Sequence, residues 1–312
     1  MCKDKNQIVK IKSSETTREA LLTRFCFKEY INLSPPEHSA NVDTTFLEWL
    51  IGFFEAEGSF LTWIYKRRRF AIEVSQKDGP LIHKIRSELG FGRVTEIKRK
   101  SEMYWRYYAQ DVVSLTRLIS LFNGNLITEK KLDQFKDWLS KYNTSKNKEI
   151  LFLPKRVEIS LRDAWLSGFL EGDAGFFIKP HDIIRFTKKK NEPKYDLKMK
   201  FYLTQKNELT LLTRIKELFQ IPTKTHVVTN GYTKEKYNRI ETFRLNCHLL
   251  VVNYLTRYPF RGKRSVPFSN WKSVLQYRTS NYPITDEAIA KLKLLIEKTK
   301  SGLLSEPNAE TT

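Results

Sequence analysis

Hydrophobic residues along this chain follow two periods, one typical of helices and one typical of strands. The stretch from Phe46 to Phe54 is apolar on nearly all sides, which predicts a buried helix that ends at an acidic pair. Beyond it, Phe70, Ile72 and Val74 alternate with other residues, and this period of two predicts a strand with one buried face. The elements expected next are a helix over residues 81–89, a hairpin over residues 92–109 and two further helical segments.

The same succession of periods occurs a second time. Met199, Phe201 and Leu203 are apolar and are separated by polar or amphipathic residues, which predicts another half-buried strand. A helix over residues 209–219 and a hairpin over residues 225–246 follow it. Each unit therefore has the order αββαββα, and the predicted fold class is α+β with two pseudo-symmetric repeats and antiparallel sheets.

The two units also share sequence, in the same order. Trp49 to Phe60 reads WLIGFFEAEGSF, and Trp165 to Phe176 reads WLSGFLEGDAGF. Four matches in one order indicate a duplicated domain. The later matches are Gln76 with Gln205 at the strand ends, residues 81–89 with residues 211–218, and Lys131, Phe135 and Trp138 with Arg264, Phe268 and Trp271.

These matches predict how the chain is divided. Polar residues and Pro154 mark a linker between the repeats, and Pro35-Pro36 lies in an N-terminal extension with weak local structure. The predicted segments are an extension over residues 1–43, a first repeat over residues 44–143, a linker over residues 144–160, a second repeat over residues 161–300 and a flexible tail over residues 301–312.

Charge indicates the kind of partner. The 312 residues include 55 Lys and Arg against 35 Asp and Glu, and a net charge of +20 favours a polyanion. Basic and aromatic residues are interleaved, as in Tyr104 to Tyr108, which favours nucleic acid over a membrane surface. No segment approaches the roughly 20 apolar residues of a membrane span. The three cysteines are too scattered for a disulfide framework or a zinc site, which indicates a reducing compartment.

Small residues recur on the two acidic helices. Gly52 and Ala56 are four residues apart, as are Gly168 and Gly172, and this spacing lets two helix backbones approach closely. Packed together, the helices would bring Glu57 and Asp173 side by side at their C-terminal ends. Two adjacent carboxylates repel each other and the helix ends add negative potential, so we expect a bound divalent cation, with Mg²⁺ as the best match.

The two acidic helices resemble the signature motif of a known family. Leu50 to Gly58 and Leu166 to Ala174 are similar to the LAGLIDADG motif, and the resemblance extends from about Thr45 to about Lys300. It implies a monomeric homing endonuclease that makes a metal-dependent double-strand cut in a long, non-palindromic DNA site. It assigns the metal-binding acids to Glu57 and Asp173, adds the Ala56 and Gly172 carbonyls, and implies two or three Mg²⁺ ions. Glu55 and Glu171 are expected to be structural, and Ala174 stands where the family usually has glycine.

Several polar residues are candidates for supporting roles in catalysis. Gln76 and Gln205 lie at strand ends and either organise water or cap the strand. The resemblance also implies a lysine near each metal. The candidates are Lys98 or Lys100 in the first repeat and Lys224 or Lys234 in the second, and Lys98 is the one we select.

The polar face of each sheet is the expected DNA contact, because Arg and Lys read guanine while amides read adenine. We expect contacts from Thr62, Lys66, Arg68, Glu73, Ser75, Arg106, Lys198, Lys200, Tyr202 and Arg244.

Three other functions remain open at this stage. The same fold supports an RNA maturase that binds its own intron RNA, and it also supports a catalytically inactive DNA-binding regulator. The intact acids favour cleavage over both. Glu96-Ile97-Lys98 fits an acid-x-Lys fragment of another nuclease type, but such triplets are common in a chain this rich in charge. The resemblance places the gene in an organellar intron, so we expect a mitochondrial protein, with the chloroplast as second choice.

Overall fold

The structure is a computed structural model of the whole chain, and it describes most of its length. The described ranges are 24–33, 43–65, 67–99, 101–154, 157–179, 183–186, 193–231, 233–280 and 282–301. Among the predictions made above, those for Lys66, Lys100, most of the N-terminal extension and the tail after residue 301 lie outside the described residues.

The first half consists of one sheet, the helix that leads into it and the helices that follow. Its antiparallel strands lie in the order β1-β2-β4-β3. A short helix, α1 (Lys28–Asn32), precedes this half and buries Tyr30. The elements are α2 (Thr44–Glu57), β1 (Gly58–Tyr65), β2 (Arg67–Gln76), α3 (Gly79–Leu89), β3 (Arg93–Arg99), β4 (Glu102–Ala109), α4 (Val112–Phe122) and α5 (Glu129–Lys146).

The second half repeats this plan, with strand order β5-β8-β10-β9. A separate two-stranded hairpin, β6 (Ile184–Phe186) with β7 (Pro193–Tyr195), is inserted before β8. The predicted α+β fold with two αββαββα units is confirmed. The other elements are α6 (Trp165–Asp173), β5 (Ala174–Ile178), β8 (Met199–Gln205), α7 (Leu209–Leu218), β9 (His226–Thr229), β10 (Lys236–Thr242), α8 (Leu245–Arg257), α9 (Ser265–Thr279) and α10 (Asp286–Ser301).

The helices bury one face of each sheet. Phe70 of β2 packs edge-on against Trp138 and Tyr142 of α5, with ring centroids 5.6 and 5.3 Å apart. In the second half Phe201 of β8 packs against Phe219, just beyond α7, at 5.8 Å. The alternate residues of each strand form the opposite, polar face. None of the described helices is long and apolar enough to cross a membrane.

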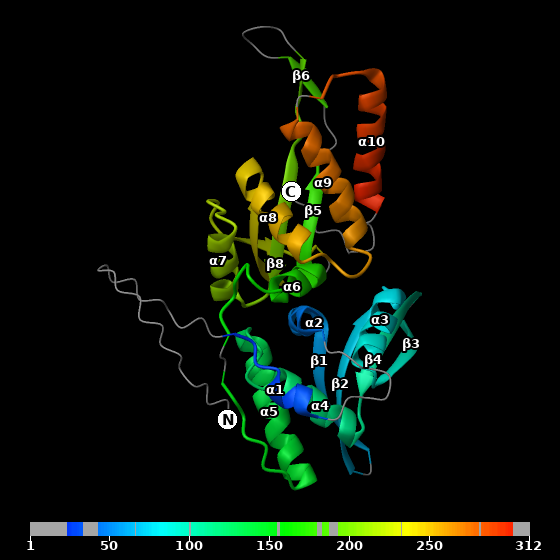
Figure 1. The fold of residues 1–312 in the computed structure, drawn as a ribbon, viewed down its shortest axis with the longest axis vertical. Coiled ribbons are helices and arrows are strands. Elements are labelled where there is room, and N and C mark those ends of the chain that lie inside the picture. The colour runs from blue at the N-terminus through cyan, green and yellow to red at the C-terminus, as the bar shows by residue number, and fades with distance from the viewer. Residues whose placement is uncertain are drawn as a thin grey trace, which may run out of the picture.

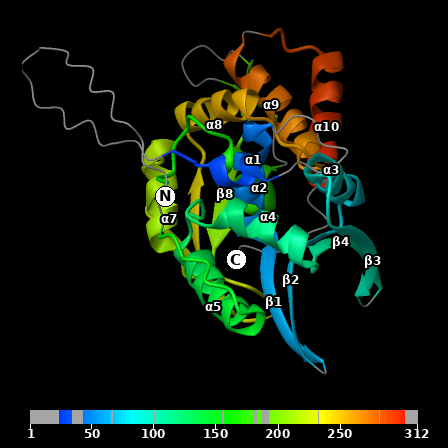
Figure 2. The same ribbon diagram turned by 60° about the horizontal axis from the view of Figure 1, so that its bottom comes forward.

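The two halves meet along α2 and α6, which lie between the two sheets (Figures 1 and 2). A Cβ atom added to Gly52 would collide with the carbonyl oxygen of Trp165, and one added to Gly168 would collide with the carbonyl oxygen of Trp49. The contact is reciprocal, so the helices are related by an approximate two-fold axis. Glycine is required at both positions because backbone lies against backbone.

We predict that Gly52→Ala and Gly168→Ala each lower the free energy of unfolding by about 3 kcal/mol, because the added methyl group has a carbonyl rather than a movable side chain in its way. Chemical denaturation measures this. Gly231→Ala is the matched control, since its Cβ would meet nothing within 4 Å. Equal stability of all three variants would contradict the close helix contact.

Candidate metal and nucleic-acid site

Glu57 and Asp173 are the last residues of α2 and α6, respectively, and both are partly buried. The helix contact continues to this end. A Cβ atom on Gly172 would lie 2.5 Å from the Cβ atom of Ala56 and 3.3 Å from Oε1 of Glu57. Glu57 therefore lies directly against the end of the opposite helix, which ends in Asp173.

The donor types at this junction fit a hard divalent cation. Two carboxylates lie where two helix C-termini converge, and such a site favours positive charge. Within the described ranges there is no group of three or more His, Cys, Asp or Glu residues that could hold a metal. Further ligands would have to be backbone carbonyls, water or phosphate oxygens, which Mg²⁺ accepts readily.

Lys131 is a basic residue of the site that the sequence interpretation did not select. It is buried, and its ammonium group donates to the carbonyl oxygen of Gly58, the residue after Glu57. Burial lowers the pKa of Lys131 to about 8, and Lys130 acts in the same direction, whereas Glu55, Glu57 and Asp173 raise it. The acids of both motifs thus act on this one lysine.

Arg264 is the counterpart of Lys131 in the second half. Its Nε donates to the carbonyl oxygen of Glu171 at 2.5 Å and its Nη2 to that of Gly172 at 3.0 Å. Its Nη1 donates to the carbonyl oxygen of Ala174. The guanidinium group therefore satisfies the free carbonyls at the end of α6 and places a positive charge there.

The sequence contained a signal for this pair. Lys131 and Arg264 occupy the same position in the repeat match that also aligns Trp138 with Trp271. The predicted Lys98 is exposed on the edge strand β3, and Lys224 and Lys234 are also exposed. Recurrence of a basic residue at the same place in both copies is a criterion that Lys131 and Arg264 meet and the numerous hairpin lysines do not.

Glu55 and Glu171 hold the segments that lead into the two basic residues. Glu55 accepts from the backbone N–H groups of Ile127 at 2.9 Å and Thr128 at 2.7 Å, just before Lys131. It also accepts from the indole N–H of Trp165 on the opposite helix at 2.6 Å. These contacts are structural ones, and they support the structural role expected of Glu55.

The second half repeats this arrangement. Glu171 accepts from the backbone N–H groups of Arg261 at 2.9 Å and Gly262 at 2.5 Å, just before Arg264. It also accepts from the indole N–H of Trp49 at 2.8 Å. Burial raises the pKa of both buried acids, that of Glu55 to about 7.

The strand-end glutamines lie near the helix ends. Nε2 of Gln205, the last residue of β8, donates to Oδ2 of Asp173 at 2.6 Å. Gln76 occupies the matching last position of β2. A direct bond to the motif acid gives Gln205 an orienting role at the second acid.

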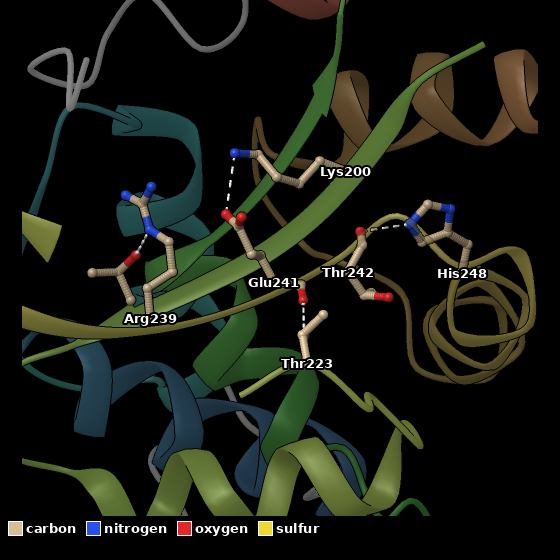
Figure 3. Close-up of polar contacts among 7 residues, drawn as sticks. Lys200, Thr223, Arg239, Glu241, Thr242 and His248 are labelled. Atoms are coloured by element: carbon tan, nitrogen blue, oxygen red, sulfur yellow. Dashed lines mark hydrogen bonds and ion pairs between the residues drawn. The ribbon is translucent and has the colours of Figure 1, made fainter. Parts of the chain in front are cut away.

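The polar face of the second sheet carries cations that are paired with neighbouring side chains, Lys200 with Glu241 and Arg239 with a threonine hydroxyl (Figure 3). Lys200 pairs with Glu241 at 3.1 Å, and its ammonium lies 5.5 Å from the ring centroid of Tyr202. The Arg239 guanidinium lies 4.8 Å from the centroid of the same ring, and its Nε donates to Thr204 at 2.9 Å. Side chains held in this way keep their positions before any ligand arrives.

The polar face of the first sheet leaves donors and acceptors unsatisfied. Ser75, Arg106 and Thr95 lie in register on β2, β4 and β3. The hydroxyls of Ser75 and Thr95 and the Nε of Arg106 are buried and have no hydrogen-bond partner within the described part of the chain. Arg106 also pairs with Glu73 at 3.4 Å. Buried polar groups without partners are costly, so this row is suited to a polar ligand.

The other residues predicted to contact DNA lie at the ends of strands or next to them, outside the middle of the two polar sheet faces. Thr62 pairs directly with Phe70, so Thr62 and Arg68 lie on the helix-covered side of the first sheet, at its exposed end. Lys198 is exposed just before β8, and Arg244 is exposed just before α8.

A family model described as LAGLIDADG endonuclease matches residues 50–142 and again residues 166–275. The chain belongs to this family. The two matches coincide with the two halves of the fold, so this is a member with two motifs on one chain.

Relatives of this LAGLIDADG protein come from introns. One is the "Probable intron-encoded endonuclease 4" of Neurospora crassa, 29% identical over 73% of this chain but only 39% of that protein. Another is an "Uncharacterized cox1 intron-2 37.2 kDa protein" of Schizosaccharomyces pombe, 23% identical over 90% of this chain and 80% of that protein. The "Intron-encoded RNA maturase bI4" of Saccharomyces cerevisiae is 26% identical over 52% of this chain and 25% of its own length.

Solved structures confirm the fold. The LAGLIDADG meganuclease I-AabMI, solved bound to uncleaved DNA, superposes with a TM-score of 0.61 and 19% sequence identity, over 80% of this chain and 98% of that one.

We predict that Glu55→Gln lowers the free energy of unfolding by about 1–3 kcal/mol, because the new amide NH₂ would face N–H donors that now have an acceptor. Glu171→Gln should behave in the same way. Thermal unfolding of both variants tests this, with Glu88→Gln on the exposed side of α3 as the control. Wild-type stability of the Glu55 variant would contradict the structural role.

Proposed function

We propose that this protein is a monomeric homing endonuclease that makes a metal-dependent double-strand cut in a long, non-palindromic DNA site. The observation that carries the proposal is the convergence of Glu57 and Asp173 at the crossed ends of α2 and α6. Binding of nucleic acid without cleavage has no need of two acids held together against their repulsion.

Glu57 and Asp173 would hold two or three Mg²⁺ ions, with the carbonyl of Ala56 and the second lone pair of the Gly172 carbonyl, which already accepts from Arg264, as further ligands. Bound divalent ions supply an activated water and stabilise charge on the phosphate. The remaining contributions come from side chains of the protein. We assign the cationic role first given to Lys98 to Lys131 and Arg264, because these lie at the helix ends whereas Lys98 is exposed on an edge strand.

The glutamines act on the attacking water in this proposal. Gln205 bonds to Asp173 through one amide N–H, and its amide oxygen is available to accept from a water beside that acid. Gln76 ends β2 as Gln205 ends β8, so we assign it the equivalent role at Glu57. The direct contact of Gln205 with Asp173 supports this role over simple strand capping.

The two polar sheet faces bind the DNA. Glu73, Ser75 and Arg106 of the first sheet and Lys200 and Tyr202 of the second read base edges in the major groove. Because the two faces differ in sequence and in charge arrangement, each half reads a different sequence. Thr62, Lys66, Arg68, Lys198 and Arg244 then contact the flanking backbone.

We also propose residues 44–143 and 161–300 as the two functional units, joined by residues 144–160. The intron-encoded relatives support a mitochondrial location, because one of them is named for a cox1 intron. A relative named as an RNA maturase supports intron RNA as a second ligand.

The proposal predicts that Glu57→Gln and Asp173→Asn each reduce cleavage by about 100-fold or more, because each removes a metal ligand. Purified protein is incubated with a randomised double-stranded DNA library and Mg²⁺, and the cut sites are sequenced. Glu88→Gln, far from the helix ends on α3, should cut like the wild type.

Affinity for the selected site should survive in both acid variants, since neither residue lies on a sheet face. Tight, salt-dependent binding without any cleavage by the wild type would contradict the nuclease proposal and favour the maturase or the regulator.

A further inference from the structure

A cavity opens at the outer corner of the first sheet. Strand β4 ends at Ala109, opposite Ile72, so β2 continues outward with only β1 as its partner. The notch left beside residues 68–70 is bounded by the starts of β3 and α4 and by the end of α5. It encloses about 290 Å³.

The lining of this cavity is strongly cationic. Arg68, Arg69 and Arg93 reach it from β2 and β3, and Lys146 reaches it from the last residue of α5. In the described part of the chain none of these four forms an ion pair. The one acid in the lining, Asp111, is engaged as the N-cap of α4, where it accepts from the Ser114 backbone N–H at 2.8 Å.

Asp111 offsets one of these four positive charges, so the cavity keeps an excess of positive charge that a bound anion would neutralise. The neutral lining suits an oxyanion as well, because the Gln110 amide can donate a hydrogen bond. Arginine forms paired hydrogen bonds with phosphate oxygens, so the composition fits a phosphodiester group.

The cavity is continuous with the polar face of the sheet. Arg93 pairs with Tyr108, which pairs with Glu73, so all three lie on the same face as Arg106. Arg69 is also on this face, because it alternates with the buried Phe70. A DNA strand that runs outward along the polar face of the sheet would therefore reach the cavity. This continuity favours the DNA target over a separate RNA molecule as the ligand of the cavity.

We propose that this corner cavity, formed by Arg68, Arg69, Arg93 and Lys146, is a binding site for one backbone phosphate of the target DNA, at the outer end of the half-site read by the first repeat. The assignment rests on the proposed function. In this assignment Arg68 contacts a phosphate from the helix-covered side of the sheet. Arg69, Arg93 and Lys146 are DNA contacts that the sequence alone did not predict.

The test is the salt dependence of binding by the double variant Arg93→Gln/Lys146→Gln. Loss of one phosphate contact should reduce the slope of log K against log salt by about 1 on a long duplex. The control removes the same charge elsewhere, in Lys141→Gln/Arg214→Gln, whose side chains pair with Asp137 and Glu217. Circular dichroism verifies that both variants are folded.

Duplex length locates the contact. When the DNA is shortened on the side of the first repeat, wild type and the cavity variant should bind with the same slope, whereas shortening the other side should leave their difference intact. Equal slopes on the long duplex would overturn the assignment. So would a loss confined to intron RNA. Failure of the wild type to cut any site would instead contradict the proposed nuclease function, which is a separate readout.

Discussion

The contact between α2 and α6 is the constraint on which the rest of this structure depends. Gly52 and Gly168 bring backbone against backbone, and no side chain fits between the helices at these points. Everything at the candidate site follows from that closeness. Glu57 reaches the end of the opposite helix, and the two sheets are held at a fixed separation on either side. A helix pair spaced by ordinary side chains would leave the acids too far apart to share ions.

Because the repeat is duplicated, the hydrogen bonds that hold the two halves together occur in equivalent pairs. Each helix sends an indole N–H to the buried acid of the other, from Trp49 to Glu171 and from Trp165 to Glu55. The backbone N–H of Lys130 bonds to Glu208 at 3.2 Å, and that of Lys263 bonds to Asp78 at 2.5 Å. Every one of these bonds crosses from one half to the other, so the halves position each other's site.

Much of this arrangement could be predicted from the sequence, because periodicity and repetition are local properties. The motif helices, the strand alternation and the meeting of Glu57 with Asp173 all follow from spacing. The roles of Lys131 and Arg264 required the fold, since both lie some 70 to 90 residues from the carbonyls they bond. The face occupied by Arg68 depends on strand register, which composition does not reveal.

The two half-sites also differ in ways that residue types alone do not predict. Lys131 donates to the carbonyl oxygen of Gly58 at the end of α2, whereas Arg264 donates to three carbonyl oxygens at the end of α6. Among the described residues, the first sheet has polar groups without hydrogen-bond partners around Arg106, whereas in the second Lys200 and Arg239 are already paired. Divergence after duplication thus changed the surroundings of two acids whose positions stayed equivalent, which agrees with the proposal that each half reads a different DNA sequence.

The most direct test of this account is a crystal structure of the protein bound to its selected target in the presence of Mn²⁺, with the metal located by anomalous scattering. The account predicts manganese peaks at the junction of α2 and α6, in contact with carboxylate oxygens of both Glu57 and Asp173. Cut DNA with manganese bound elsewhere, or coordinated by neither acid, would contradict it.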